Sequence, residues 1–173
     1  MLDIQPQFLP LIKLLDGRLF HIPEYQRAYS WRSHERRDLF DDILRVHSKG
    51  PNAGHFMAAI VALRRKKMRI GTDEFFTLEV VDGQQRLTTL VILLKSIELA
   101  LNKEKKQEAK LADEIRSLLI KSDGARLLLL QTNHDTSNHF SNYIREGEAG
   151  PSHDAKTVAD RELLKAIEDC KGV

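Results

Sequence analysis

The sequence is short of the residues and segments that mark several large protein classes. Cys170 is the only cysteine among 173 residues, so an intrachain disulfide is impossible and a zinc site built from cysteines is excluded. No apolar run reaches the roughly 18 residues of a membrane-spanning helix, and the N-terminus lacks the basic region and apolar core of a signal peptide. We therefore expect a soluble, cytoplasmic protein with no membrane partner.

Three common catalytic signatures are also missing from the sequence. It contains no HExxH, no GxxxxGK[ST] and no GxSxG. The sequence therefore lacks the characteristic motifs of zincin proteases, Walker-type nucleotide hydrolases and α/β-hydrolases. Lysine and arginine number 27 against 25 acidic residues, and this net charge of +2 gives no nucleic-acid signal by itself. The charge is nevertheless split, with +6 in residues 1–70 and −4 in residues 71–173. A basic, phosphate-facing first half or a chance clustering of solvated helix faces explains this split equally well.

Hydrophobic spacing predicts alternating helices and strands over the first 101 residues. Helices are predicted at residues 8–15, from an N-cap at Ser33 onward, and from Leu87 to Leu101. Strands are predicted at residues 18–22, 55–63 and 76–81. Residues 64–67, which are all basic, are predicted to form a connector after the second of these strands.

The rest of the chain is predicted to be almost entirely helical. The expected helices lie at residues 109–120, 126–130, 136–145 and 157–170. With strands confined to the first 81 residues, the pattern predicts an α/β (α+β) fold. Residues 1–101 would form a small sheet core with helices, and residues 102–173 an all-helical extension. The last helix continues to within three residues of the end, which suggests a chain truncated before further domains.

The strongest local motif is the segment VVDGQQRLTTL at residues 80–90. A strand ends at Val81, Gly83 permits a tight turn and a helix begins within one or two residues. The backbone N–H groups of Gly83 to Arg86 would then lie at a helix N-terminus, where unpaired donors and the helix dipole favour an anion. Arg86 adds a cation suited to bidentate phosphate contact, and we expect it to be exposed in a cleft.

Three further side chains of this motif are candidates for chemistry. Gln84 and Gln85 can donate to phosphate oxygens or hold a water molecule, and Asp82 can coordinate magnesium or orient a water. A plain structural interpretation remains open. Asp-Gly is a common turn, Asp82 can cap the helix, and Arg86 can be an ordinary surface side chain.

A second motif, IPEYQRAYSW at residues 22–31, forms a loop between a predicted strand and a predicted helix. Its aromatic side chains can stack on a base, and Arg27 can contact a phosphate or the edge of a guanine. The alternative is that Tyr29 and Trp31 fill the core while Arg27 pairs with an acid such as Asp82. We favour the structural interpretation for Trp31 and a functional one for Gln26 and Arg27 together.

Taken together, the two motifs and the apolar segment HFMAAIVAL at residues 55–63 resemble the N-terminal domain of GmrSD-type modification-dependent restriction endonucleases. The resemblance covers roughly residues 5–145. It implies a fold like that of ParB and sulfiredoxin, whose members bind nucleoside triphosphates through a strand-turn-helix motif. Residues 82–86, DGQQR, would form the phosphate site, and Tyr25, Gln26 and Arg27 would face the same cleft. Family members usually carry glycine where this chain has Ala58.

The resemblance also implies a function. Nucleoside triphosphate binding or hydrolysis with Mg²⁺, by Asp82, Gln84, Gln85 and Arg86, would control a nuclease that cleaves modified DNA. That nuclease, commonly an HNH-type domain or a partner subunit, has no counterpart in the 173 residues, and a homodimer is one possible assembly. The alternative hypothesis is a DNA-binding module without catalysis, in which the basic first half and the aromatic loop read modified DNA directly.

Overall fold

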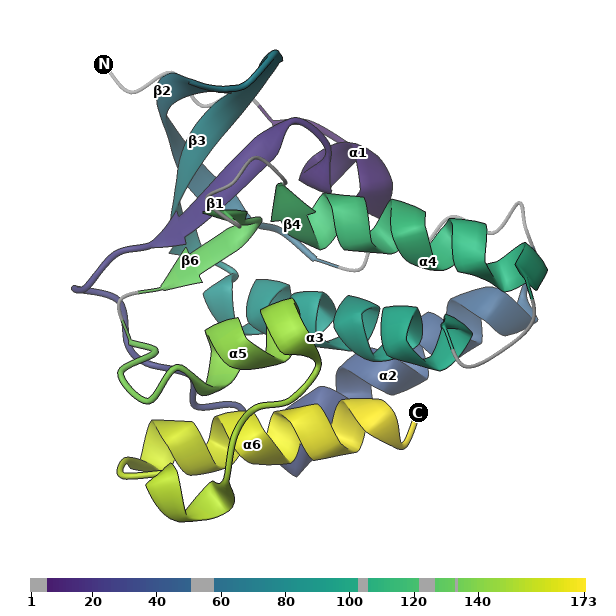
Figure 1. The fold of residues 1–173 in the computed structure, drawn as a ribbon, viewed down its shortest axis with the longest axis vertical. Helices are drawn as coiled ribbons and strands as arrows, with labels where there is room; N and C mark the ends of the chain where they lie inside the picture. Colours follow the sequence, from purple (N-terminus) through teal and green to yellow (C-terminus); the bar gives the residue numbers. More distant parts are fainter. Residues whose placement is uncertain (1–5, 51–57, 103–105, 122–126, 133) are drawn as a thin grey trace.

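The structure, a computed structural model, describes residues 6–50, 58–102, 106–121, 127–132 and 134–173 (Figure 1). Its centre is a four-stranded mixed sheet with the strand order β2-β3-β1-β6. These strands are β1 (Arg18–Ile22), β2 (Val61–Ile70), β3 (Asp73–Asp82) and β6 (Leu130–Thr132). β1 pairs in parallel with both β3 and β6, whereas β2 is antiparallel to β3. The carboxyl ends of β1, β3 and β6 therefore lie at the same edge of the sheet.

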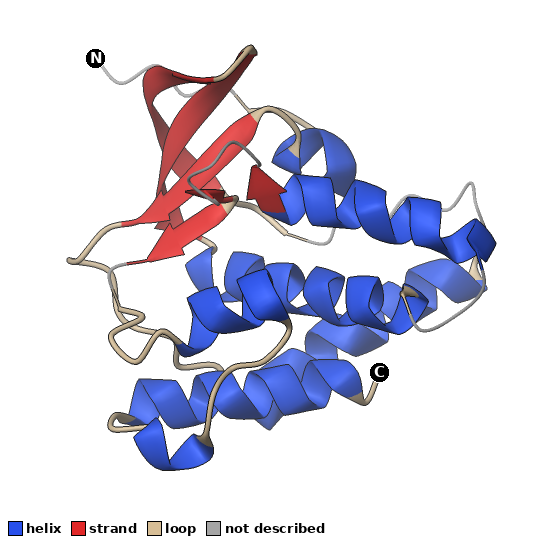
Figure 2. Ribbon diagram, viewed as in Figure 1, coloured by secondary structure: helices blue, strands red, loops and turns tan. Residues whose placement is uncertain are grey.

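The helices occupy the side of the molecule away from the β2–β3 hairpin, as Figure 2 shows. They are α1 (Leu11–Leu15), α2 (Ser33–Ser48), α3 (Gln84–Leu101), α4 (Lys106–Leu119), α5 (His139–Glu146) and α6 (Val158–Lys171). A two-stranded sheet, β4 (Ile120–Lys121) with β5 (Leu127–Leu128), and a short 3-10 helix, η1 (Ser152–Asp154), complete the fold. In the described parts of the chain, no helix is long and apolar enough to cross a bilayer.

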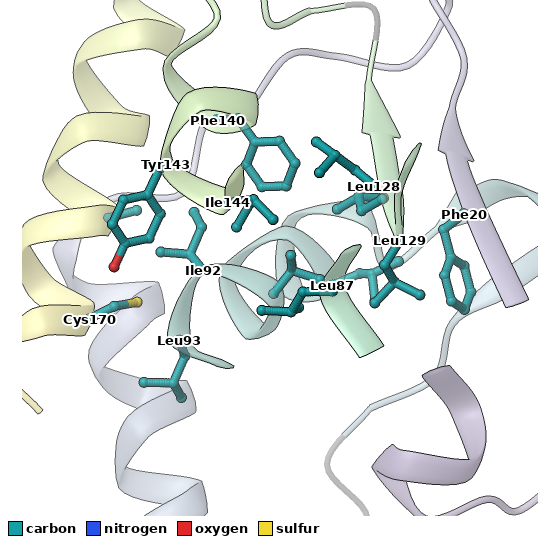
Figure 3. Close-up of a cluster of buried hydrophobic side chains, with 14 of the residues drawn as sticks. Phe20, Leu87, Ile92, Leu93, Leu128, Leu129, Phe140, Tyr143, Ile144 and Cys170 are labelled. Atoms are coloured by element: carbon teal, nitrogen blue, oxygen red, sulfur yellow. The ribbon is translucent and has the colours of Figure 1, made fainter. Parts of the chain in front are cut away.

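Helix α3 is the central element of the core. Leu87 and Ile92 on this helix are fully buried and belong to one hydrophobic cluster that includes side chains from β1, the β5–β6 segment, α5 and α6 (Figure 3). Twelve of the eighteen α3 residues are buried, among them the polar Gln84 and Gln85 of the first turn. The first turn of α3 therefore belongs to the packed interior, and its polar side chains need partners there.

Most of the elements predicted for the first half are confirmed, but the position of the second strand is wrong. β2 begins at Val61 and runs to Ile70, so residues 64–67 are strand rather than connector. Residues 58–60 are not strand, and residues 55–57 lie outside the described part. β2 is an edge strand whose residues 64–69 are exposed, and an exposed edge carries charged side chains. The apolar run at residues 55–63 therefore did not predict the position of this strand.

The helix predicted at residues 126–130 is also wrong. Residues 127–128 form β5 and residues 130–132 form β6, while residue 126 lies outside the described part. Four successive leucines suit a buried strand as well as a buried helix, and periodicity cannot separate the two over so short a run. Strands are consequently not confined to the first 81 residues, and the second part is not all helical.

Smaller differences concern the ends of helices. α1 begins at Leu11, directly after Pro10, and α5 begins at His139 rather than near residue 136. The N-cap of α2 is Arg32, so Ser33 is the first helical residue. The predicted division near residue 101 and the likeness to ParB and sulfiredoxin remain predictions. Across that division, β6 pairs with β1, and the hydrophobic cluster contains residues from both sides.

Candidate functional site

Three loops converge at the first turn of α3. They leave the carboxyl ends of the parallel strands β1, β3 and β6, and they contain residues 23–30, 82–83 and 134–138. In sheets with parallel strands, the region beyond the carboxyl ends is where ligands bind, because the loops there can be shaped without disturbing the strands. The DGQQR motif spans the turn from β3 into α3, and Tyr25, Gln26 and Arg27 lie on the loop of residues 23–30, which we call the YQR loop.

Gly83 makes the turn between β3 and α3. Its φ of +86° lies in the left-handed region, and a Cβ atom there would come within 2.8 Å of the Ala59 carbonyl oxygen. The Gly83 N–H donates to Asp82 Oδ1 at 2.8 Å, and no side chain caps α3 among the described residues. The next N–H groups of the helix have no partner within the helix, so this end carries the partial positive charge of an uncapped terminus.

Gln84 and Gln85 are both buried, and both bind the backbone of the YQR loop. Gln84 Nε2 donates to the Arg27 carbonyl oxygen at 3.1 Å. Gln85 Nε2 donates to the Ala28 carbonyl oxygen at 3.1 Å, and Gln85 Oε1 accepts from the Ser30 N–H at 2.8 Å. Both ends of the Gln85 amide are thus hydrogen-bonded, whereas Gln84 Oε1 is buried with no partner in the described part of the chain. Of the two amides, that of Gln84 keeps an oxygen available for a ligand or a water.

The aromatic residues of the loop pack against the same helix. Tyr29 shares a hydrogen bond of 2.8 Å between its hydroxyl and Thr89 Oγ1, and burial raises the pKa of Tyr29 to about 12. Trp31 is half-buried, and the Arg86 guanidinium lies 5.6 Å from the centre of the indole ring. Arg86 is also half-buried, and its Nε lacks a partner among the described residues. This differs from the exposed position that the sequence suggested for Arg86.

Tyr25 and Gln26 are attached to β3 on the outer side of the loop. The Tyr25 hydroxyl donates to Glu79 Oε1 at 2.9 Å, and Gln26 Nε2 donates to the Val81 carbonyl oxygen at 2.9 Å. Glu79 also accepts two hydrogen bonds from Arg65, at 2.9 and 3.0 Å, which lower the pKa of the Glu79 carboxyl. The hydrogen bond to Glu79 raises the pKa of Tyr25.

A cavity of about 30 Å³ lies behind the first turn of α3. Among the predicted site residues, Arg27, Gln84 and Gln85 line it. The predicted residues that do not line it are Tyr25, Gln26, Asp82, Gly83 and Arg86. The structure therefore divides the predicted residues between an inner cavity and an outer surface at the same end of α3.

Comparison with known families matches residues 11–172 of this fold to the GmrSD restriction endonuclease, N-terminal domain. The chain belongs to this family. It is therefore a component of the restriction enzymes of phage defence, for which DNA is the substrate. A search of curated proteins finds no match.

In this GmrSD N-terminal domain, sequence reasoning missed the contribution of the third loop and of α6. The cavity is also lined by Thr132, His134, Asp135 and Asp160. Two of these are helix caps: Asp135 accepts from the Phe140 and Ser141 N–H groups of α5, and Asp160 accepts from the Thr157 N–H of α6. A short apolar run followed by the polar residues His134 and Asp135 is a strand-then-loop pattern, and it was the available signal for this loop.

Burial and hydrogen bonding act in opposite directions on Asp160. Burial raises the pKa of its carboxyl, but hydrogen bonds from Thr157 and Ser137 outweigh burial and leave the pKa lowered. Asp160 is therefore held as a carboxylate at the rim of the cavity.

The described residues contain no group of three or more side chains that could hold a metal ion alone. Magnesium, however, usually takes one or two carboxylates and completes its shell with phosphate oxygens and water. Asp82 is exposed directly before the first turn of α3 and fits that limited role. Magnesium binding at Asp82 remains a prediction.

Proposed function

We propose that this domain binds a nucleoside triphosphate at the first turn of α3 and hydrolyses it to regulate a nuclease that acts on modified DNA. The observation that carries the proposal is an uncapped helix N-terminus whose first residue, Gln84, has a buried amide oxygen with no partner in the described residues. Gln84 is only 7% exposed. This oxygen only accepts hydrogen bonds, so it requires a donor such as a water, whereas the unpaired N–H groups of the helix end suit phosphate oxygens.

Two arginines supply the positive charge for the phosphates. Arg86 lies in the first turn of α3 with its side chain against Trp31, and its buried Nε has no partner among the described residues. Arg27 is exposed, and its carbonyl oxygen is bound by Gln84 Nε2, so its backbone is fixed beside the same turn. A planar guanidinium suits bidentate contact with phosphate oxygens.

The other predicted residues receive distinct roles in this proposal. Asp82 would hold the magnesium ion, which neutralises phosphate charge when bound. Gln85 and Gln26 would fix the loop rather than contact the nucleotide, because their amides are used in hydrogen bonds to the backbone. Tyr25 is 69% exposed and can offer its ring face to a base.

The alternative function, a DNA-binding module without catalysis, rests on the exposed basic residues of β2. Two of these cations are already paired, Arg65 with Glu79 and Lys67 with Glu74, which weakens the attraction of this strand for phosphates. Direct binding of modified DNA that depends on salt but not on nucleotide would favour this alternative.

The test is calorimetric titration of ATP, GTP, CTP and UTP, each with magnesium, into the wild-type chain and two variants. We expect at least one triphosphate to bind the wild type and Arg86→Ala to weaken it about 10- to 100-fold, the value of a charge-assisted hydrogen bond. Arg69→Ala, an exposed arginine on β2, is the matched control and should bind as the wild type does. No binding by a folded wild type, or equal binding by all three proteins, would contradict the proposal.

A further inference from the structure

Two residues that line the cavity behind α3 each carry a buried polar atom with no partner in the described residues. One is Gln84 Oε1, and the other is His134 Nε2 from the loop after β6. A volume of about 30 Å³ is room for about one water molecule, and a cavity with polar partners holds water rather than staying empty. A water in this cavity is the kind of partner that such atoms require.

The side chain of Gln84 and the backbone at His134 are held in place by their surroundings. Gln84 is fixed by its Nε2 bond to the Arg27 carbonyl oxygen. The backbone N–H of His134 donates to Thr132 Oγ1 at 3.2 Å, and the neighbouring Asp135 anchors the loop to the start of α5. A water between Gln84 and His134 would therefore be positioned before any ligand arrives.

We propose that His134 is a catalytic residue that accepts the proton of the water attacking the γ-phosphate, while Gln84 orients that water. This inference rests on the proposed function. The water donates one hydrogen to Gln84 Oε1 and the other to His134 Nε2, which leaves an oxygen lone pair for attack. A bond forms between the water oxygen and the γ-phosphorus, and the bond from this phosphorus to the β–γ bridging oxygen breaks. The diphosphate leaves with the electron pair, and the proton passes to His134 Nε2.

Other ionisable groups that line the cavity are less suited to this role. The carboxylates of Asp135 and Asp160 accept backbone N–H groups at the starts of α5 and α6, and these bonds stabilise their charged forms. Arg27 also lines the cavity and can only donate. Among the described residues that line the cavity, His134 is the one with a buried ring nitrogen that has no partner.

The experiment compares wild type, His134→Gln and His153→Gln of the full chain in two assays. Calorimetry with a β,γ-imido triphosphate and magnesium measures binding, and phosphate release from the natural triphosphate measures hydrolysis. Glutamine can hydrogen-bond to the water but cannot take its proton, so we expect His134→Gln to bind within about two-fold of wild type and to lose about 100-fold or more in rate. His153, whose side chain is 80% exposed, is the control and should change neither.

A second variant, His134→Ala, tests the proposal even if His134→Gln fails to fold. In His134→Ala, added imidazole should enter the enlarged cavity and restore part of the phosphate release. Hydrolysis at the wild-type rate by His134→Gln would overturn the inference, as would a joint loss of binding and hydrolysis or an absence of imidazole rescue. A wild type that binds triphosphate without hydrolysing it would overturn the role of His134 alone. A wild type that binds none would overturn the proposed function as well.

Discussion

Two adjacent glutamines at the start of α3 have different hydrogen-bond partners, and we therefore assign them different roles. Gln85 holds the loop in place, and Gln84 can contact a water or ligand. Gln85 uses both ends of its amide on the backbone of the YQR loop. Gln84 uses one end and keeps a buried oxygen at the cavity. From the sequence, either glutamine could equally well be predicted to hold a water. The partners that distinguish them lie 55 to 57 residues away in the chain, so they are not visible in the local sequence.

Gly83 provides the sharpest residue-scale prediction about stability. Gly83→Ala would place a side chain at φ +86° and 2.8 Å from the Ala59 carbonyl oxygen. We expect it to lower the free energy of unfolding by about 2–3 kcal/mol, because the strained backbone and the close contact add. Urea unfolding followed by circular dichroism measures this change.

The matched control for Gly83 is Gly17, which has a φ of +63° but nothing within 4 Å of the added Cβ. Gly17→Ala should therefore cost only the conformational part, about 1 kcal/mol. Equal losses for both variants would mean that the close approach of residues 59–60 to the turn contributes nothing.

At the scale of elements, the site depends on how α6 is fixed against the rest of the fold. Arg36 on α2 is completely buried, and its guanidinium bonds to Asp169 Oδ2 of α6 at 2.7 Å and to the Trp31 carbonyl oxygen at 2.5 Å. Its Nη1 also lies 3.7 Å from Glu162 Oε2. One side chain thus ties α6, which lines the cavity through Asp160, to the end of the YQR loop.

Removing this connection should destabilise the whole domain. We expect Arg36→Ala to lower the free energy of unfolding by about 3 kcal/mol, because it opens a cavity and leaves the Asp169 carboxylate and the Trp31 carbonyl without their donor, while Glu162 keeps Lys165. Arg37→Ala, at the exposed neighbouring position, should change it by less than about 0.5 kcal/mol. Thermal or urea unfolding of the two variants measures these changes. Similar losses of unfolding free energy in both variants would show that Arg36 does not hold α6 to the YQR loop.

Elements with a strong local pattern could be predicted from sequence, and those defined by pairing could not. β1, β3 and α3 carry regular apolar spacing, and they lie close to where the sequence places them. β2 continues through exposed basic residues because its hydrogen bonds to β3 hold it, and β6 is a strand because it docks beside β1. Neither reason is visible in a local window of sequence.

At the scale of the whole molecule, parallel pairing of β1 with β3 and β6 is what assembles the site. It brings loops centred on residues 26, 83 and 134 to one edge of the sheet. The first two carry motifs that sequence analysis could find. The third was hidden, because no strand was predicted at residues 130–132 and the pairing that defines β6 spans about 110 residues.

The most direct test of the central claim is to map where a nucleoside triphosphate binds. Amide chemical shifts of the ¹⁵N-labelled 19.8 kDa chain would be followed during titration with a β,γ-imido triphosphate and magnesium. We predict the largest changes at residues 83–86, with smaller ones at 26–28 and at His134. Saturable changes confined to other surfaces, such as the β2–β3 hairpin, or no changes at all, would contradict a phosphate site at the start of α3.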